Sequence, residues 1–389
     1  MTEETVTIIG AGIGGLCAAL GLVRAGRQVE VYEQAPVLGE VGAGLSISPN
    51  ASLGLGYLDM LDYMEAESDK PLWQYTRHGL THEELVAIDR RNAVEQYDAT
   101  YYQIHRADFH AELVRRVELE QPGCIKTGYR LKQLSRAPGG FGLQFDNGET
   151  VVADILIGAD GLRSEVRGAL FSDDQPQFTN YVAWRALIPA NELPAWYAQP
   201  ASHVWLHAGK NCVTYPIRKQ KLINLVAFTQ TEDWVEEGWA VEADPEEFIA
   251  HFEGWHEKPR TLIEATRGRK MNRWGLFART PLDCLTDDNV ALLGDAAHPM
   301  LPWFGQGASS SIEDGVVLAR CFEEAGDARA ALALYNKTRV DRVKTIQRES
   351  NLGGERLHKL DPYTLRDLPV KNEDSLGIFK YNPAQVEIA

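Results

Sequence analysis

Small and apolar residues dominate the first part of the chain and change their spacing twice. Thr5–Ile9 is a β-branched run that ends at a glycine, small and apolar residues then recur at helical spacing to Ala25, and Gln28–Glu33 alternates again. A strand, a helix and a second strand in this order form a βαβ unit. The chain is therefore predicted to open with two parallel strands.

Two later apolar runs have the character of buried strands. Asp154–Gly158 leads into Asp160-Gly161, and Asn289–Gly294 leads into Asp295. In open α/β sheets, ligands bind beyond the carboxyl ends of the strands. These two strand ends, together with the end of the first strand, are expected to lie close to a bound nucleotide.

Between these strands the chain carries short aromatic and β-branched runs separated by turns. They predict an inserted antiparallel sheet made of Tyr181–Pro189, His203–His207, Cys212–Ile217 and Leu222–Thr229. A hairpin is predicted from Phe141–Phe145 and Thr150–Val152, which are joined by an Asp-Asn-Gly turn.

Two helices are predicted in the last third of the chain. The first covers Gln306–Glu324 and the second runs from Asp327 to about Ser350, in a stretch rich in Ala, Arg and Lys. Beyond Gly353 the helical pattern fades into Pro, Asp and Tyr. A C-terminal segment of less regular structure is expected there.

Composition narrows the possible partners. The 389 residues exceed the usual size of a single core, and a hydrophobic content of 44% suffices for a large one. A net charge of −16 argues against nucleic acid, and the basic run Arg267–Lys270 is interpreted as a solvated turn. Five scattered cysteines suggest neither disulfides nor a zinc site, so no metal and a cytoplasmic location are expected.

The apolar run Val6–Val23 has the length of a membrane segment. It follows two glutamates rather than a basic region, and five glycines interrupt it. We interpret it as strand, turn and helix, and we expect no membrane span.

The turn after the first strand carries the strongest motif. Gly10, Gly12 and Gly15 match G-x-G-x-x-G, in which glycines permit a tight turn and close approach of the backbone to a pyrophosphate. Glu33 ends the second strand, where a carboxylate can accept hydrogen bonds from an adenosine ribose. Within a βαβ unit this combination predicts dinucleotide binding, whereas a glycine-rich helix contact would leave Glu33 unexplained.

Two aspartates at strand ends are further candidates for cofactor binding. Asp160 lies in a Gly-Ala-Asp-Gly motif, and Asp295 lies in Gly-Asp-Ala-Ala-His-Pro, which is followed by Gly305 and Gly307. A carboxylate at such a place can bind ribitol or ribose hydroxyls. The alternative for both aspartates is capping of a helix N-terminus, which needs no ligand.

Together with the glycine-rich turn and His105-Arg106-Ala-Asp108, these motifs resemble the signature set of the aromatic-ring flavoprotein hydroxylases of the salicylate hydroxylase type. The resemblance extends from Thr5 to about Arg348. It implies that Asp295 binds the ribityl chain of FAD, that Arg106 lies near the FAD phosphates, and that Asp160 serves both FAD and NADH or NADPH. No second G-x-G-x-x-G occurs, so the nicotinamide is expected to bind transiently at a cleft between domains.

The fold implied is α/β, with a Rossmann-type FAD-binding domain, an inserted β-rich substrate domain and C-terminal helices. We predict a discontinuous FAD domain from residues 1–70, 100–175 and 275–350. Residues 71–99 and 176–274 are assigned to the substrate domain, and residues 351–389 to the C-terminal segment.

The activity implied is hydroxylation of a small aromatic or N-heteroaromatic compound, with NAD(P)H and O2, through a flavin hydroperoxide. The protein is expected to be a monomer or a homodimer. Two alternatives stay open: a flavin oxidase or dehydrogenase that needs no nicotinamide, and a flavin-binding module without turnover.

Three residues are candidates for catalysis. His298 lies in the Gly-Asp-Ala-Ala-His-Pro motif and can accept a phenol proton. A structural histidine that hydrogen-bonds to the backbone is an equally good interpretation. Asn211 stands where phenol-hydroxylating relatives place a histidine, four residues before Tyr215, and an amide cannot take a proton. Ser46 likewise replaces a histidine of the hydroxynicotinate enzyme. Tyr215 can hydrogen-bond the substrate or simply pack in the sheet.

Overall fold

The β-branched runs predicted as strands pair side by side in a six-stranded sheet. The computed structural model describes residues 4–39, 43–232, 241–358, 361–367 and 372–388. In sheet order the strands are β18 (Thr286–Asp287), β19 (Val290–Leu292), β11 (Ile155–Gly158), β1 (Val6–Ile9), β2 (Val29–Glu33) and β7 (Ile125–Thr127). All neighbours are parallel except β18 and β19. The βαβ unit and both later strands are therefore confirmed.

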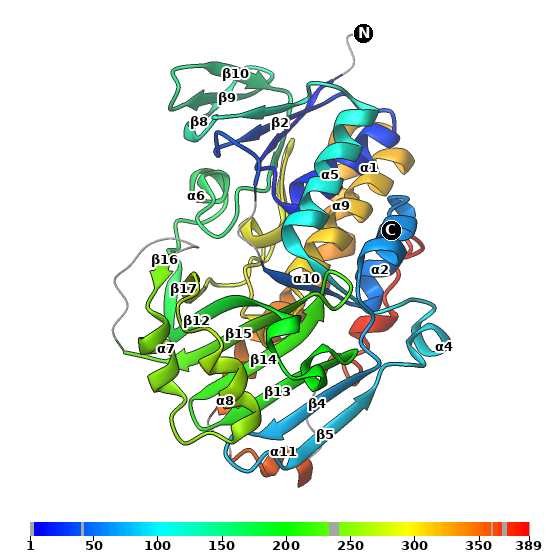
Figure 1. The fold of residues 1–389 in the computed structure, drawn as a ribbon. Coiled ribbons are helices and arrows are strands. Elements are labelled where there is room, and N and C mark those ends of the chain that lie inside the picture. The colour runs from blue at the N-terminus through cyan, green and yellow to red at the C-terminus, as the bar shows by residue number, and fades with distance from the viewer. Residues whose placement is uncertain (1–3, 40–42, 233–240, 359–360, 368–371, 389) are drawn as a thin grey trace.

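Helices cover one side of this sheet (Figure 1). They are α1 (Ile13–Arg24), α5 (Arg106–Glu120) and α9 (Gly307–Glu324). The first and last approach closely because small residues meet at their contact, where a Cβ on Gly315 would lie 2.7 Å from the backbone nitrogen of Ala18. This tight packing holds the beginnings of both helices at the same edge of the sheet.

A second sheet of eight strands forms the other half of the molecule (Figure 1). Its order is β16 (Val241–Ala243), β17 (Met271–Ala278), β12 (Gln177–Pro189), β15 (Leu222–Gln230), β14 (Lys210–Ile217), β13 (Ala201–His207), β4 (Trp73–His78) and β5 (Glu84–Asp89). The four predicted strands and their antiparallel pairing are confirmed. The sheet also contains β4, which the prediction did not include and which pairs with β13 in parallel. Those two strands are distant in sequence, so no tight turn dictates their relative direction.

The large sheet has two different faces. Cys212, Trp205 and Trp184 point to a core that is closed by α7 (Pro245–His251) and α8 (Glu257–Glu264). Residues at alternating positions, Asn211 and Tyr215 among them, point to the opposite face, since side chains alternate along a strand. We call this opposite face the cleft face.

The remaining elements are short. They are β3 (Gly44–Ile47), β6 (Tyr102–His105), β8 (Leu131–Ala137), β9 (Gly140–Phe145), β10 (Thr150–Ala153), α2 (Pro49–Tyr57), α3 (Leu61–Glu67), α4 (Ala93–Tyr97), α6 (Glu165–Leu170), α11 (Thr364–Asp367) and the 3-10 turns η1 (Ala190–Glu192), η2 (Ala195–Ala198), η3 (Gly294–Ala296), η4 (Pro302–Phe304) and η5 (Ile378–Lys380). The predicted hairpin is confirmed as β9 and β10.

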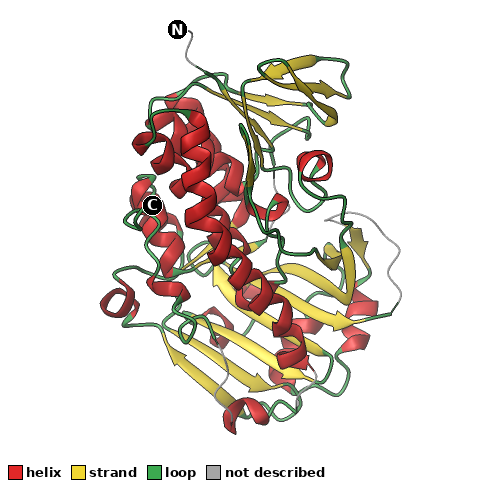
Figure 2. Ribbon diagram, turned by 180° about the vertical axis from the view of Figure 1, so that it is seen from behind, coloured by secondary structure: helices red, strands yellow, loops and turns green. Residues whose placement is uncertain are grey.

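The last long helix, α10 (Ala328–His358), runs from the helical layer to the large sheet (Figure 2). Its predicted end near Ser350 is wrong by eight residues. Gly353 and Gly354 continue the helix because the ring of Trp303 lies against them, and a Cβ on Gly353 would be 2.6 Å from the Cβ of Trp303. Tertiary packing thus outweighs the low helix propensity of glycine.

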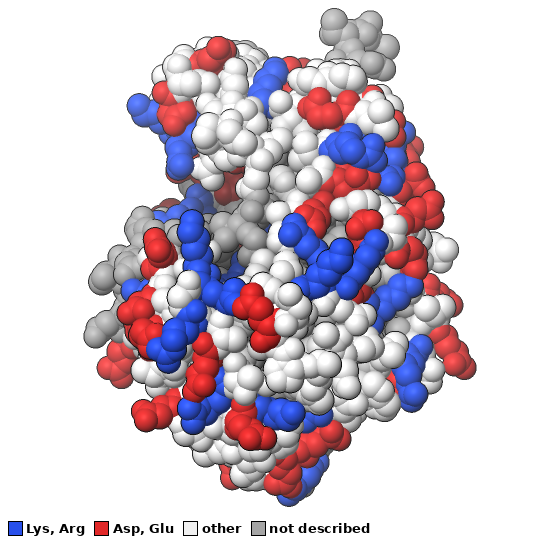
Figure 3. Space-filling view, viewed as in Figure 1, with Lys and Arg blue, Asp and Glu red and all other residues white. Residues whose placement is uncertain are grey.

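The charge of the surface and the apolar character of the helices bear on whether the protein could bind nucleic acid or cross a membrane. Acidic and basic side chains are interspersed over the face shown in Figure 3. Among the described residues, no helix combines the length and apolar character that a membrane crossing requires.

The large sheet draws strands from residues 73–89 and 177–278, while the exact domain bounds stay a prediction.

Candidate active site

The three predicted strand ends lie next to one another. Strand β1 stands between β2 and β11, and β11 pairs with β19, so that Ile9 is opposite Gly158 and Gly158 is opposite Leu292. Gly10, Asp160 and Asp295 follow these strands at the same carboxyl edge of the sheet. The structure therefore brings together motifs that are up to 285 residues apart.

The glycine-rich turn is shaped by close backbone contacts. Gly10 has a φ of +105°, and an added Cβ would lie 2.4 Å from the carbonyl oxygen of Ala159. A Cβ on Gly15 would lie 2.1 Å from the oxygen of Gly10. At Gly12, by contrast, an added Cβ meets nothing within 4 Å. The first and third glycines are needed by the turn itself, whereas the second borders open space at the start of α1.

Glu33 supports this turn directly. Its Oε2 accepts a hydrogen bond from the backbone nitrogen of Ala11 at 2.8 Å, and its Oε1 accepts one from Ala35 at 2.8 Å. The His110 ring on α5 contacts the carbonyl oxygen of Ala11 at 2.7 Å. Both residues hold the turn in shape, and the remaining lone pairs of the Glu33 carboxylate can still receive a ribose hydroxyl.

The two candidate aspartates have different surroundings. Asp160 accepts hydrogen bonds from Ser164 Oγ at 2.5 Å and from the backbone nitrogens of Glu165 and Val166, at the start of α6. Asp295 caps nothing, and its carboxylate has no hydrogen-bond partner in the described part of the chain. Asp160 thus caps the N-terminus of a helix, as the alternative interpretation of the sequence expected, whereas Asp295 does not.

The electrostatic surroundings of Asp295 suit a ligand. Burial raises the pKa of its carboxyl group, and the positive charges of His298 and Arg106 oppose that rise. Arg106 is the first residue of α5, and its backbone nitrogen donates to the carbonyl of Ala43 at 2.8 Å. The predicted cofactor residues Arg106 and Asp295, which are 189 positions apart, therefore lie within electrostatic reach of each other.

Arg167 links the segment that follows Asp160 to the loop that follows Asp295, a role that the sequence did not reveal. Its guanidinium is fully buried and donates to the carbonyl oxygen of Ala297 at 3.0 Å and to that of Thr280 at 2.8 Å. Asp174 pairs with it at 3.1 Å. An arginine can donate five hydrogen bonds in a fixed fork, which fits it to hold a loop by its carbonyls.

His298 is buried in the Gly-Asp-Ala-Ala-His-Pro segment that follows β19. Its Nε2 lies 2.6 Å from Asp314 Oδ2, and its Nδ1 is a buried atom that has no partner among the described residues. Asp314 in turn binds the fully buried Arg339 at 2.8 Å, and Arg339 binds Glu313 at 2.7 Å. A chain of buried charges therefore fixes the loop that follows β19.

Gly305 and Gly307 flank the start of α9. Gly305 has a φ of +62°, which glycine adopts without strain, and an added Cβ at Gly307 would meet nothing closer than 3.9 Å. Gln306 between them is buried and binds Ser48 and Asn50. As at Gly12, the backbone at the start of this helix borders open space.

Tyr215 lies on the cleft face of β14. Burial raises its pKa, while the hydroxyl of Ser46 and the charge of Arg185 oppose that rise. Burial also raises the pKa of Tyr101, and there too Ser46 opposes the rise, after Arg90. Strand β3 can approach so closely because a Cβ on Gly44 would lie 2.6 Å from the ring of Tyr215. Ser46, Tyr101 and Arg185 therefore all act electrostatically on Tyr215.

Asn211 contacts a residue that the sequence did not single out. Its Oδ1 lies 2.9 Å from Nε2 of His358, the last residue of α10. The ring of His358 packs 4.8 Å from those of Trp303 and Tyr181. Among the predicted catalytic residues, Asn211 and Tyr215 thus share the cleft face, while His298 lies in the loop that follows β19.

These contacts fit FAD. The open space beside Gly12 suits a phosphate next to helix backbone N–H groups that lack intrahelical partners. The unpartnered Asp295 carboxylate suits a polyol, and Glu33 suits a ribose. The donor and acceptor types found along this edge therefore match an extended dinucleotide from end to end.

Known proteins share these features. Residues 142–350 match the FAD binding domain family, and residues 8–49 match the NAD(P)-binding Rossmann-like domain. The chain is 34% identical to the 3-amino-4-hydroxybenzoate 2-monooxygenase PtnB3 of Streptomyces platensis, over 92% of this chain and 89% of that protein. It is 35% identical to the 6-hydroxynicotinate 3-monooxygenase of Pseudomonas fluorescens, over 89% of this chain and 90% of that protein.

The fold agrees with these relatives. A salicylate hydroxylase solved as a substrate complex superposes with a TM-score of 0.82 at 27% identity, covering 98% of this chain and 97% of that one. The full-length similarity at over 30% identity confirms the resemblance inferred from the motifs. The chain therefore belongs to the FAD-dependent aromatic hydroxylases, the flavoprotein monooxygenases that use NAD(P)H and O2 to hydroxylate small aromatic compounds.

Proposed function

We propose that this hydroxylase acts on an aromatic or N-heteroaromatic carboxylic acid that already carries a ring hydroxyl. The observation that carries the proposal is that Arg185 and Tyr215 share the cleft face and that the charge of Arg185 acts on Tyr215. An arginine and a phenol on one face provide a partner for a carboxylate and one for a hydroxyl. The substrates named for the relatives, 3-amino-4-hydroxybenzoate, 6-hydroxynicotinate and salicylate, each combine these two groups.

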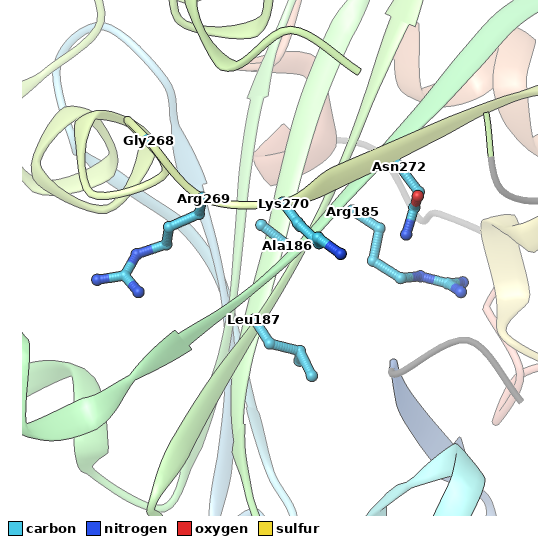
Figure 4. A pocket seen from close by; sticks show the side chains of 7 residues that line it. All are labelled: Arg185, Ala186, Leu187, Gly268, Arg269, Lys270 and Asn272. Atoms are coloured by element: carbon cyan, nitrogen blue, oxygen red, sulfur yellow. The ribbon is translucent and has the colours of Figure 1, made fainter. Parts of the chain in front are cut away.

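Arg185 is prepared for an anion by its surroundings. Its guanidinium lies 4.3 Å from the centre of the Trp274 ring, and it lines a hollow of about 400 Å³ together with Lys270 and Asn272. Figure 4 shows these three side chains extending to one side of the strands, and Arg269 to the other. Arg269 is paired with Glu192.

The remaining roles follow from the contacts. When bound, FAD would supply the redox and oxygen-transfer chemistry. We propose that Gly10, Gly12, Gly15, Glu33, Arg106, Asp160, Asp295, Gly305 and Gly307 hold it. Tyr215 and Ser46 would orient the substrate hydroxyl, and Asn211 would act from the same face. His298 would act through the loop that Asp314 fixes, with its Nδ1 turned to a ligand.

Arg185→Ala is expected to weaken binding of 6-hydroxynicotinate by roughly 10- to 100-fold, because a charge-assisted hydrogen bond contributes about 1.5–3 kcal/mol. The binding of 2-hydroxypyridine, which lacks the carboxylate, should change little. Both can be measured from the change in flavin absorbance. Arg273→Ala is the matched control, since Arg273 pairs with Trp184 in the register and points to the opposite face. Equal losses for both ligands would show that Arg185 does not read the carboxylate.

Asp295→Asn is expected to weaken FAD by about 1–3 kcal/mol, because the neutral amide loses the charge that makes these hydrogen bonds strong. Titration of the apoprotein with FAD measures the effect. Asp160→Asn provides the contrast: since its carboxylate caps α6, we expect a loss of about 1 kcal/mol in the free energy of unfolding of the apoprotein. An unchanged FAD affinity in Asp295→Asn would return Asp295 to a structural role.

A further inference from the structure

The cleft face of the large sheet is open in one row of side chains. Arg185 on β12 lies opposite Val226 on β15, which lies opposite Val213 on β14, and all three are partly exposed. We call these three residues the open row. On β15 and β14 the cleft-face positions to either side are buried, and they are Phe228 and Asn211 in one direction and Asn224 and Tyr215 in the other. Two valines in the middle of the sheet therefore present apolar surface that the described part of the chain does not cover completely.

Two different segments cover the buried positions on either side of the open row. Strand β3 covers Asn224, since the backbone nitrogen of Gly44 donates to its side-chain oxygen at 2.8 Å. Trp303 covers Phe228, with 5.0 Å between the ring centres, and also packs against Tyr181. Phe228 and Asn224 are four residues apart on β15, which is about 13 Å along a strand. Each covering group needs a contact distance of about 3.5–4 Å, so about 6 Å stays open between them, which suits a single aromatic ring.

The open row has the chemistry that the proposed substrate requires. Arg185 at one end lines the hollow of about 400 Å³. Tyr215 follows Val213 by two residues and therefore lies next to the other end, on the same face. A ring that lies on the two valines can direct a carboxylate to the arginine and a hydroxyl to the tyrosine. Trp303, which packs with both valines in one apolar cluster, then borders the ring on the side away from Tyr215.

Helix α10 fixes the loop that carries Trp303. Gln347, which is 1% exposed, donates to the carbonyl oxygen of Pro299 at 3.0 Å. One turn later, the side-chain oxygen of Asn351 accepts a hydrogen bond from the backbone nitrogen of Leu301 at 3.1 Å. Side chains of one helix thus hold the backbone of the loop just before Trp303.

Two glycines of the same helix leave room for the indole. An added Cβ on Gly354 would lie 2.9 Å from Nε1 of Trp303 and 3.2 Å from its Cε2, and one on Gly353 would lie 2.6 Å from its Cβ. After proline, glycine is the least favourable residue for a helix interior, so two adjacent glycines in α10 act against the helix itself. Where local preference and structure conflict in this way, a functional reason is expected. Alanine at either position would push the indole away from α10 and over the open row.

We propose that Trp303 is a specificity-determining residue that limits the substrate to a single ring, and that Gly353 and Gly354 are positioning residues that act through it. A second fused ring that extends along the strand away from Tyr215 meets the indole. This inference rests on the proposed function, in which the carboxylate and the hydroxyl of the substrate lie at Arg185 and Tyr215. It adds that the size limit is set by a helix outside the large sheet.

The test compares salicylate with 1-hydroxy-2-naphthoate and 3-hydroxy-2-naphthoate, which keep its carboxylate and hydroxyl and add a second ring on different edges. Binding to the FAD-loaded enzyme is measured from the change in flavin absorbance, without turnover. The parent is expected to bind salicylate at least about 10-fold more tightly than either naphthoate, because a filled site resists added volume. Trp303→Leu should bind one of the naphthoates at least about 10-fold more tightly than the parent does, and should change the affinity for salicylate by less than about 3-fold.

A second pair of variants tests whether the glycines act through Trp303. Gly354→Ala should weaken binding of salicylate by about 10-fold, because the displaced indole lies over the open row. Adding Trp303→Leu to Gly354→Ala should restore the affinity of Trp303→Leu alone, since leucine lacks the indole atoms that the new Cβ meets. Gly168→Ala is the matched control, because Gly168 lies in α6 with nothing within 4 Å of an added Cβ, and it should bind salicylate like the parent.

The possible outcomes separate the two parts of the inference from the proposed function. A parent enzyme that binds a naphthoate as tightly as salicylate, or a Trp303→Leu variant that gains affinity for neither naphthoate, would overturn the size limit. A Gly354→Ala variant that binds salicylate like the parent, or a loss that Trp303→Leu does not restore, would overturn the role of the glycines. A parent that binds none of salicylate, 6-hydroxynicotinate and 3-amino-4-hydroxybenzoate would instead contradict the proposed substrate class, and this inference with it.

Discussion

Gly12→Val is expected to abolish FAD binding and to leave the apoprotein folded. The backbone at Gly12 has a φ of −72°, which valine adopts, and an added Cβ meets nothing within 4 Å. The branched side chain would instead fill the space that the pyrophosphate needs at the start of α1. We expect the affinity for FAD to fall by at least about 100-fold, or ~2.7 kcal/mol. Fluorescence titration of the apoprotein with FAD measures this change.

A second glycine provides the control for this substitution. Gly326 also has open space around it and lies in the connection between α9 and α10, away from the strand ends. Gly326→Val should bind FAD like the parent. Thermal unfolding of both apoproteins should agree with that of the parent within about 0.5 kcal/mol, as for most surface changes. Full FAD occupancy in Gly12→Val would show that this turn is not the phosphate site.

Arg339→Met is expected to lower the free energy of unfolding by about 3–5 kcal/mol, the usual loss when a buried ion pair loses one partner. Arg339, Glu313 and Asp314 are all fully buried, and Arg339 binds both carboxylates. Arg342 still faces Glu313, so the main loss falls on Asp314 and on the His298 loop that it holds. Urea unfolding measures the difference.

An exposed ion pair offers the matched control. Arg329 pairs with Asp288 on the surface, where both side chains are largely exposed. Arg329→Met should change stability by no more than about 1 kcal/mol, since solvent weakens such pairs. If Arg339→Met were as mild as this control, the buried chain of charges would not be what fixes the loop.

Acid should act on the same network. Burial by itself would raise the pKa of Asp314, but His298 and Arg339 lower it to about 2. Because an unfolded aspartate titrates near 3.9, Asp314 stabilises the fold above that value, and its contribution is lost as the pH falls toward 2. Loss of Arg339 removes part of this shift, so Arg339→Met should begin to lose stability at a higher pH than the parent.

The half of the molecule built on the six-stranded sheet could be predicted from sequence because its signals are local. Each strand ends in a turn whose glycines and carboxylates are adjacent in the chain, as at Gly10 and Asp295, and parallel strands gather such ends at one edge. The direction of β4 could not be predicted, since pairing with β13 joins distant segments. Glu313 and Asp314 did offer a signal: two adjacent carboxylates in a helix of small and apolar residues indicate a buried partner.

The half of the molecule built on the eight-stranded sheet depends on contacts that no local pattern encodes. Arg185 is one polar residue in a strand without a motif, and only the pairing of that strand shows that it shares the cleft face with Tyr215. His358 lies beyond two glycines that break the helical pattern, and only the packing of Trp303 extends the helix to it. Asn211 was recognised as standing where a base is missing, and the side chain that it contacts, His358, lies 147 positions away in the sequence.

The central claim, that this chain hydroxylates an aromatic ring with oxygen from O2, is tested most directly by mass spectrometry of the product formed under oxygen-18 gas. The FAD-loaded enzyme, NADH or NADPH, and each hydroxylated aromatic acid are mixed, and consumption of the nicotinamide is followed in parallel. We predict a product that carries one labelled oxygen atom for each nicotinamide oxidised. A ring that is oxidised without gaining labelled oxygen, with the flavin reduced by the ring itself in the absence of nicotinamide, would contradict the claim and identify a dehydrogenase or oxidase.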